Sequence, residues 1–366
     1  MNHSPTPQAA LPADIRLGPV YLRVRQLARV LPFYRDLLGL VPSPAPGVAG
    51  STAGAASQGG AGTPGGAAAG DAGRVGTADH AGGLGRTGDA GVPEGSQSPA
   101  GPPRPVASAP GNGSSHPPVW LAAAAGGPPL LCLEESPGAP PRPPRTTGLY
   151  HVALLYPGRA DLARAFLRLV QGRWRFQGFA DHGVSEAIYL ADPEGNGLEL
   201  YADRPRDQWP RRNGGIAMYT APLDLEDLVA AAGGTRPDAG PDGAGDPPRG
   251  PVVGHVHLQV SRLQTVEAFY CGVLGFEVTQ RDFPGALFVA AGGYHHHLGL
   301  NVWAGEGAPP PPPGAAGLAG FTIQLPTAAD LKAVLDRARA AGHEAEPSPR
   351  GWVLRDPDGI PVFLTT

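Results

Sequence analysis

Cysteine is scarce in this chain of 366 residues, which contains only Cys132 and Cys271. Two cysteines exclude a disulfide framework and indicate a reducing compartment. Positive charge is not in excess either, because 28 Lys and Arg stand against 32 Asp and Glu, a formal net charge of −4. This balance gives no electrostatic case for binding nucleic acid or an anionic membrane surface.

Long hydrophobic runs are also missing. The first residues, MNHSPTPQAALPADIR, lack the basic stretch followed by an apolar stretch that is typical of a signal peptide. No later stretch has the length of a membrane span. We therefore expect a soluble, cytoplasmic protein without a membrane partner. The sequence does not determine the oligomeric state, and a homo-oligomer is one of the states that it allows.

Glycine and proline, in contrast, are abundant, with 55 and 45 residues. Much of this excess lies in residues 43–117, which consist mainly of Gly, Ala, Ser, Pro and Thr. Such a segment buries too little apolar surface to offset its chain entropy, so we expect a disordered insertion in a surface loop. Residues 1–14 are predicted to be a disordered tail.

The rest of the chain repeats one pattern four times: a strand, a helix and three further strands. The helix ends as FYRDLLGL in the first repeat and as FYCGVLGF in the third, and the late strands of the second and fourth contain DPEGNGLELY and DPDGIPVFL. Helices are predicted at 27–38, 161–170, 263–274 and 328–341, with a short one at 223–232. The fold class is α+β. The predicted segments are module 1 (15–136, with the insertion), module 2 (148–209), a connector (210–250), module 3 (251–305), a Pro-rich linker (306–316) and module 4 (317–366).

These helix-end and DPxG motifs resemble the vicinal-oxygen-chelate superfamily, which includes glyoxalase I, extradiol dioxygenases and bleomycin-resistance-type binding proteins. The histidine-bearing stretches GLYHVALLYP, DHGVSEAIYL, GHVHLQVS and GGYHHHLGLNVWAG are more narrowly similar to bacterial catechol-2,3-dioxygenases with four modules. The resemblance implies that two modules pair so that their curved sheets enclose a metal-centred cavity. It covers almost the whole chain apart from the tail and the insertion.

Extradiol enzymes of this superfamily use two histidines and one carboxylate on Fe(II), and the same ligands also serve Mn(II). One histidine comes from the first strand of an odd module, and the other histidine and the glutamate come from an even module. The matching residues here are His255 in module 3 and His151 and Glu199 in module 2. Module 1 has Pro19 at its histidine position, and in module 4 the sequence alignment places Phe321 and Phe363 at the positions of His151 and Glu199.

Neither sequential pair of modules therefore has a complete ligand set, but modules 2 and 3 together do. We predict that modules 2 and 3 pair around the site and that modules 1 and 4 form a degenerate pair. The resemblance further implies catalytic roles for His296, with His182 and Tyr189 as hydrogen-bond donors around the substrate oxygens. Residues 295–297 are all histidine, and the sequence does not show which of them faces the cavity.

The implied function is extradiol cleavage of a catechol-like aromatic diol by dioxygen. One alternative is a glyoxalase-like isomerase or lyase, a class that usually has four protein ligands, two of them glutamates. The late strand of module 3, HHHLGLNVW, offers no acid for that purpose. The other alternative is a metal-free binding protein of the bleomycin-resistance type, in which His151, Glu199 and His255 would have no shared role.

Overall fold

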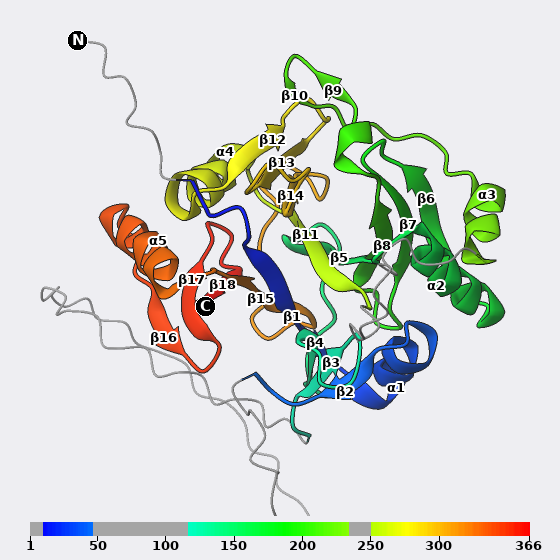
Figure 1. Cartoon of the computed structure of the whole chain (residues 1–366). Helices are drawn as coiled ribbons and strands as arrows, with labels where there is room; N and C mark the ends of the chain where they lie inside the picture. Colours follow the sequence, from blue (N-terminus) through cyan, green and yellow to red (C-terminus); the bar gives the residue numbers. More distant parts are fainter. Residues whose placement is uncertain (1–9, 47–115, 234–249) are drawn as a thin grey trace, which may run out of the picture. The chain divides into compact units, whose positions relative to one another are not determined.

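The strands of the four modules assemble into two mixed eight-stranded sheets, seen in Figure 1. The computed structural model describes residues 10–46, 116–233 and 250–366, which belong to one compact unit. We call the sheet of modules 2 and 3 the inner sheet and that of modules 1 and 4 the outer sheet. In sheet order, the inner sheet consists of β12 (Glu277–Gln280), β13 (Ala286–Ala290), β14 (Leu298–Asn301), β11 (Val252–Gln259), β5 (Gly148–Leu155), β8 (Gly197–Asp203), β7 (Ser185–Ala191) and β6 (Phe176–Asp181).

The outer sheet repeats this arrangement. Its strands are, in order, β16 (Glu346–Ser348), β17 (Gly351–Arg355), β18 (Pro361–Thr365), β15 (Gly317–Gln324), β1 (Arg16–Val24), β4 (Pro129–Glu135), β3 (Val119–Ala122) and β2 (Val41–Ser43). In each sheet the two modules join through their first strands, which run antiparallel: β5 beside β11 and β1 beside β15. The predicted pairing of module 2 with module 3, and of module 1 with module 4, is confirmed.

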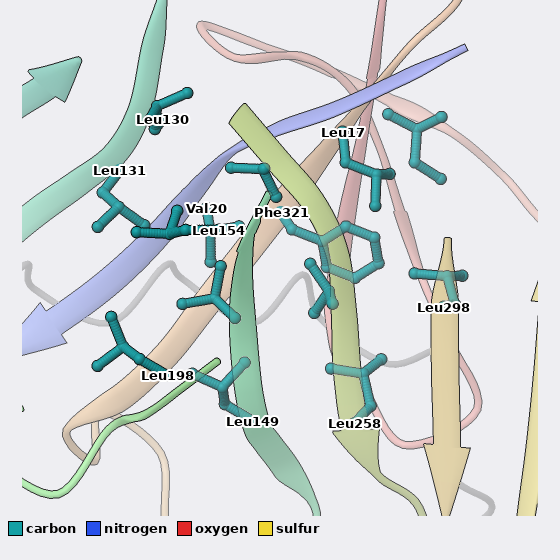
Figure 2. Close-up of a cluster of buried hydrophobic side chains, with 14 of the residues drawn as sticks. Leu17, Val20, Leu130, Leu131, Leu149, Leu154, Leu198, Leu258, Leu298 and Phe321 are labelled. Atoms are coloured by element: carbon teal, nitrogen blue, oxygen red, sulfur yellow. The ribbon is translucent and has the colours of Figure 1, made fainter. Parts of the chain in front are cut away.

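Strand alternation explains how one sheet serves both a core and a cavity. Val152 and Leu154 of β5 and Leu198 of β8 belong to the main hydrophobic core, while His151 and Glu199 at alternate positions point to the opposite face. Figure 2 shows that core, to which both sheets contribute. Its labelled residues are Leu17, Val20, Leu130, Leu131 and Phe321 from the outer sheet, and Leu149, Leu154, Leu198, Leu258 and Leu298 from the inner sheet.

The helices lie close to their predicted positions. They are α2 (Arg159–Gln171), α3 (Leu225–Ala230), α5 (Ala328–Ala340), and α1 (Leu27–Pro32) and α4 (Leu263–Glu267). The last two continue as π-helical turns, η1 (Phe33–Leu37) and η4 (Ala268–Leu274). Pro32, the last residue of α1, has no N–H to donate to the α-helical ladder. In η1 the N–H of Leu38 bonds to the carbonyl of Phe33, five residues earlier, which is the π-helical pattern. No helix in the described ranges is long and apolar enough to cross a membrane.

Two short ribbon strands and two 3₁₀ turns complete the described elements: β9 (Arg211–Arg212), β10 (Gly215–Ile216), η2 (Arg206–Gln208) and η3 (Ala231–Gly233). The tail prediction for residues 1–14 is wrong for its last residues. Leu11 is buried in the main core and its N–H bonds to Gly275 O. Residues 1–9 and most of the predicted 43–117 insertion lie outside the described residues, although Ser43 ends β2.

The register also corrects the alignment of module 4. Val152 pairs with Leu198 in the inner sheet, and Phe321 pairs with Val362 in the outer sheet. The residue equivalent to His151 is therefore Gly320, not Phe321, while Phe363 does stand at the position of Glu199. A Cβ on Gly320 would lie 2.7 Å from the Phe363 ring, so glycine makes room for that ring.

Candidate metal centre and cavity

The candidate ligands come from three neighbouring strands of the inner sheet. His255 on β11 pairs with Ala153 on β5, Ala153 pairs with Glu199 on β8, and Glu199 pairs with Tyr189 on β7. These residues form one row across the sheet on the same face. His151 lies two residues before Ala153 and therefore shares that face. The small side chain of Ala153 leaves the centre of the row open.

The three donor atoms converge on one point. His151 Nε2 lies 2.9 Å and His255 Nε2 lies 3.1 Å from Oε2 of Glu199, and the two nitrogens are 3.3 Å apart. Donors that each lie about 2.1 Å from one ion at right angles are about 3.0 Å apart. The triangle therefore fits one face of an octahedrally coordinated ion. Among the described residues, no other group of three or more His, Cys, Asp or Glu side chains has its ligand atoms close enough together to hold one metal ion.

The protonation states suit a divalent cation. Burial lowers the pKa of His255 to about 4 and outweighs the attraction of Glu199, so this ring is neutral near pH 7. Burial alone would raise the pKa of Glu199, but His255 and His151 outweigh it and hold that pKa well below its usual range. A carboxylate beside a neutral imidazole is the form that binds a metal ion.

A cavity of about 600 Å³ opens above this triangle. His182, Tyr189 and His296, the three residues predicted to surround the metal, all line it. Its walls are largely aromatic, and the half-exposed rings of Tyr150 and Trp303 lie 5.2 Å apart. The structure thus brings together all six predicted site residues from modules 2 and 3.

The bond between His182 and Tyr189 has a defined direction. Nδ1 of His182 lies 2.8 Å from Tyr219 O, which can only accept, so Nδ1 carries a proton. In the neutral ring Nε2 is then an acceptor, and it lies 2.7 Å from the Tyr189 hydroxyl, which donates to it. Burial, together with Glu199, raises the pKa of Tyr189 well above its usual value and keeps this phenol protonated. The Tyr189 oxygen therefore offers lone pairs to the cavity.

The three consecutive histidines do not form part of a strand, because β14 begins at Leu298. His296 lines the cavity, and its ring lies 4.1 Å from that of His255 between centroids. His295 is fully buried and bonds to Asp203. His297 accepts a bond from the N–H of Ala291 and does not line the cavity. The sequence left open which of the three histidines faces the cavity, and the structure places His296, the residue given the catalytic role, in the cavity wall.

His257 also lines the cavity, although no firm role could be assigned to it from the sequence. Its ring stands 4.9 Å from that of His151 and perpendicular to it, and its buried Nε2 has no partner among the described residues. Burial lowers its pKa well below the usual value, so the ring is neutral. Gly299 makes room for it, because a Cβ there would lie 2.7 Å from His257 Cγ. The alternation His255–His257 was the available signal.

The corresponding face of the outer sheet is filled with aromatic side chains. Tyr21 lies 5.1 Å from Phe363 and 5.8 Å from Trp120 between ring centroids, and the guanidinium of Arg350 lies 4.2 Å from the Tyr21 ring. Cys132 is buried in the same cluster, and burial raises the pKa of its thiol to about 12. This packing occupies the space that the cavity occupies in the inner sheet.

Comparison with known proteins agrees with this architecture. The chain is 46% identical to the catechol-2,3-dioxygenase of Bacillus subtilis (strain 168) over 232 residues, which cover 62% of this chain and 78% of that protein. A 66-residue stretch is 38% identical to biphenyl-2,3-diol 1,2-dioxygenase 3 of Rhodococcus globerulus, covering 18% of this chain and 35% of that protein.

A crystal structure of a Bacillus subtilis protein described as a candidate dioxygenase superposes with a TM-score of 0.53, covering 97% of this chain and 86% of that one. At 9% identity this match concerns the fold alone. The family model described as Glyoxalase/Bleomycin resistance protein/Dioxygenase superfamily matches residues 106–200 and 252–363. These residues are more than half of the sequence, and the chain belongs to this superfamily.

Proposed function

We propose that the chain is an extradiol ring-cleaving dioxygenase, which binds Fe(II) through His151, His255 and Glu199 and cleaves a catechol-like aromatic diol with dioxygen. The main support is the triangle of donor atoms, with edges of 2.9, 3.1 and 3.3 Å. Two histidines and one carboxylate on one face are the facial triad of non-haem iron oxygenases, in which the remaining positions stay open. Mn(II) fits the same donors.

Bound Fe(II) would supply a positive charge that lowers the pKa of the diol and an adjacent place for dioxygen. The protein's own groups then handle the protons. Burial, reinforced by His255, lowers the pKa of His296 well below its usual value, so the neutral ring has a lone pair for a substrate proton. We assign His296 as the group that accepts this proton and later returns it.

The lone pairs of Tyr189 and the aromatic walls orient the substrate. The Tyr189 hydroxyl donates to His182 and therefore accepts from a diol hydroxyl rather than donating to it. Phe288, which lies 5.0 Å from the His296 ring, and Trp303, which lies 5.4 Å from the His257 ring, offer flat apolar surfaces to an aromatic ring.

The glyoxalase-like alternative has less support. The register places Gly299 of module 3 at the position equivalent to Glu199 of module 2. A glutamate at that position would meet the His257 ring, which occupies the space beside Gly299. A second glutamate ligand is therefore missing from the described strands at the place where the four-ligand class would need it.

The test is to purify the protein without oxygen, load it with Fe(II), and mix it with dioxygen and a panel of catechols and hydroquinones. We expect a yellow ring-fission product and consumption of one dioxygen per diol. Protein loaded with zinc serves as the control and should form no colour. Stoichiometric iron without colour or oxygen uptake across the panel would refute the proposal.

A further inference from the structure

Behind His296, a line of hydrogen-bonded side chains leads away from the cavity. Nδ1 of His296 lies 2.8 Å from Nδ1 of His295, and Nε2 of His295 lies 2.9 Å from Oδ1 of Asp203. His295 is fully buried, and the side chain of Asp203 is 24% exposed. Asp203 is the last residue of β8, the strand that also carries Glu199. Asp203, at the end of this line, and Glu199, one of the proposed metal ligands, therefore lie on the same strand.

The position of His295 is fixed from several sides. The ring of Tyr294 lies 4.0 Å from its ring between centroids, and that of Trp209 lies 5.2 Å away. The hydroxyl of Tyr294 donates to the other carboxylate oxygen of Asp203, at 3.0 Å. Both oxygens of Asp203 are thus engaged, and its orientation toward His295 is held.

The hydrogen-bond chemistry of this line assigns a proton to each bond. A carboxylate only accepts, so His295 donates from Nε2 to Asp203. In a neutral ring Nδ1 of His295 is then an acceptor. The bond between the two Nδ1 atoms needs one donor, which must be His296. The proton of His296 is therefore on Nδ1, and its Nε2, for which no described residue provides a bond, keeps a lone pair.

We propose that Asp203 and His295 are positioning residues, which hold His296 in the Nδ1–H tautomer and leave Nε2 as the proton acceptor of the cavity. The inference rests on the proposed function, in which His296 accepts the proton of the diol. Without the two residues the ring would be free to take the other tautomer, with a proton on Nε2 and no lone pair for the substrate. Neither residue lines the cavity, so their effect on the reaction is exerted through His296.

Two variants test the proposal, Asp203→Asn and His295→Gln. An asparagine keeps the shape but not the charge of Asp203, and its amide can donate to His295 and reverse the order of donors. A glutamine at 295 can donate to Nδ1 of His296 and so favour the wrong tautomer. We expect kcat to fall at least about tenfold in both, since positioned acid–base groups contribute about 10²–10⁴-fold. KM for catechol and the iron content should stay within about twofold. Asp203→Glu should recover part of kcat.

Asp207→Asn is the matched control, because it removes the charge of an exposed aspartate four residues after Asp203 that does not line the cavity. Its kcat should stay within about twofold of wild type. The tautomer itself is read from ¹⁵N shifts of histidine-labelled, metal-free protein, with the His296 signals identified by their loss in His296→Gln. Wild type should show a protonated Nδ1, and His295→Gln a protonated Nε2.

The outcomes separate this inference from the proposed function. If wild type cleaves no diol but shows the Nδ1–H tautomer, the proposed function fails and the tautomer assignment stands. If wild type is active and either variant keeps its full kcat, or wild-type His296 carries its proton on Nε2, the positioning role is refuted. Loss of iron in both variants would also overturn it, because it would assign the two residues to the metal centre.

Discussion

The phenol of Tyr34 donates a 3.1 Å hydrogen bond to Oδ2 of Asp192, which lies 158 positions later in the turn between β7 and β8. Tyr270 makes the equivalent bond to Asp356 at 2.9 Å. Both pairs join the FY motif of an odd module to the DPxG motif of the following even module. Strands thus connect modules 2 with 3 and 1 with 4, while these buried bonds connect 1 with 2 and 3 with 4.

Two arginine side chains add hydrogen bonds between the same pairs of modules, 1 with 2 and 3 with 4. Arg168 of α2 donates to the carbonyls of Leu37 and Leu38 at the end of the module 1 helix. Arg337 of α5 donates in the same way to the carbonyls at the end of the module 3 helix. These carbonyls have no partner within their own helices, so a cation placed there satisfies them. The motifs that identify the superfamily are therefore the residues that hold its modules together.

The joint at Asp356 predicts a specific pH dependence. Burial raises the pKa of Asp356 to about 7, against the opposing effect of its hydrogen bonds. The folded state therefore holds this proton more tightly than the unfolded chain, and the stabilisation is complete below about pH 4 and is lost as the pH rises through 7. Relative to Asp356→Asn, the free energy of unfolding of wild type should fall by on the order of 1 kcal/mol per pH unit between pH 5 and 7.

Urea unfolding at several pH values measures this difference. Asp336→Asn on the exposed side of α5 is the control and should follow the wild-type curve closely. Curves for wild type and Asp356→Asn that run parallel from pH 5 to 8 would show that the carboxyl does not titrate in this range.

Removal of the carboxylate from the proposed centre should abolish metal binding. Glu199→Gln keeps the shape of the side chain but leaves neutral donors, and we expect iron affinity to fall more than about 100-fold, because loss of an outer partner alone costs about 10–100-fold. Metal analysis after dialysis gives the stoichiometry. Tyr21→Phe, in the outer sheet, should bind as wild type does. A Glu199→Gln protein that retains one iron per chain would exclude Glu199 as a ligand.

The glycine beside His257 should be essential for activity. Gly299→Ala would place a methyl group 2.7 Å from His257 Cγ, so the ring must move within the cavity. We expect kcat/KM for the diol to fall at least about tenfold, about 1.4 kcal/mol in transition-state stabilisation. Gly138→Ala is the control, because a Cβ there meets no atom within 4 Å. Equal kinetics for the two variants would show that the position of His257 does not matter.

The insertion in module 1 should be dispensable. Ser43 of β2 pairs with Trp120 of β3, so the two strand ends already lie side by side without the intervening chain. Deleting residues 47–115 and closing the loop with a short glycine-containing turn should leave Tm within about 3 °C and iron content unchanged, since loop-closure entropy depends only weakly on length. A large fall in Tm would mean that this composition nevertheless contributes packing.

Much of the fold follows from the sequence, because the repeat is strong and one ligand set is split between modules. His151, Glu199 and His255 complete a triad only if module 2 meets module 3, and that condition predicted which modules share a sheet. The pairing register of the strands was harder to predict from the sequence. One residue separates Gly320 from Phe321, and only the strand pairing shows which of them is equivalent to His151.

Local departures from regular helix and strand geometry could not be predicted from the sequence. The π-helical turns after α1 and α4 keep the apolar spacing of ordinary helices, so periodicity does not reveal them. The histidines at 295–297 precede their strand, and their directions are set by Asp203, His296 and Ala291 rather than by strand alternation. Leu11 was missed because one leucine in a polar, proline-containing stretch gives no periodic signal.

The order of the sheets has a consequence for synthesis on the ribosome. β1 emerges well before its antiparallel partner β15, because modules 2 and 3 lie between them in the chain. Until then one edge of β1 has no strand beside it, whereas β5 and β11 meet after a much shorter stretch of chain. The inner sheet, which carries the cavity, can therefore assemble first. The outer sheet must remain incomplete until module 4 is made. Chaperone binding during translation should accordingly concentrate on the first module.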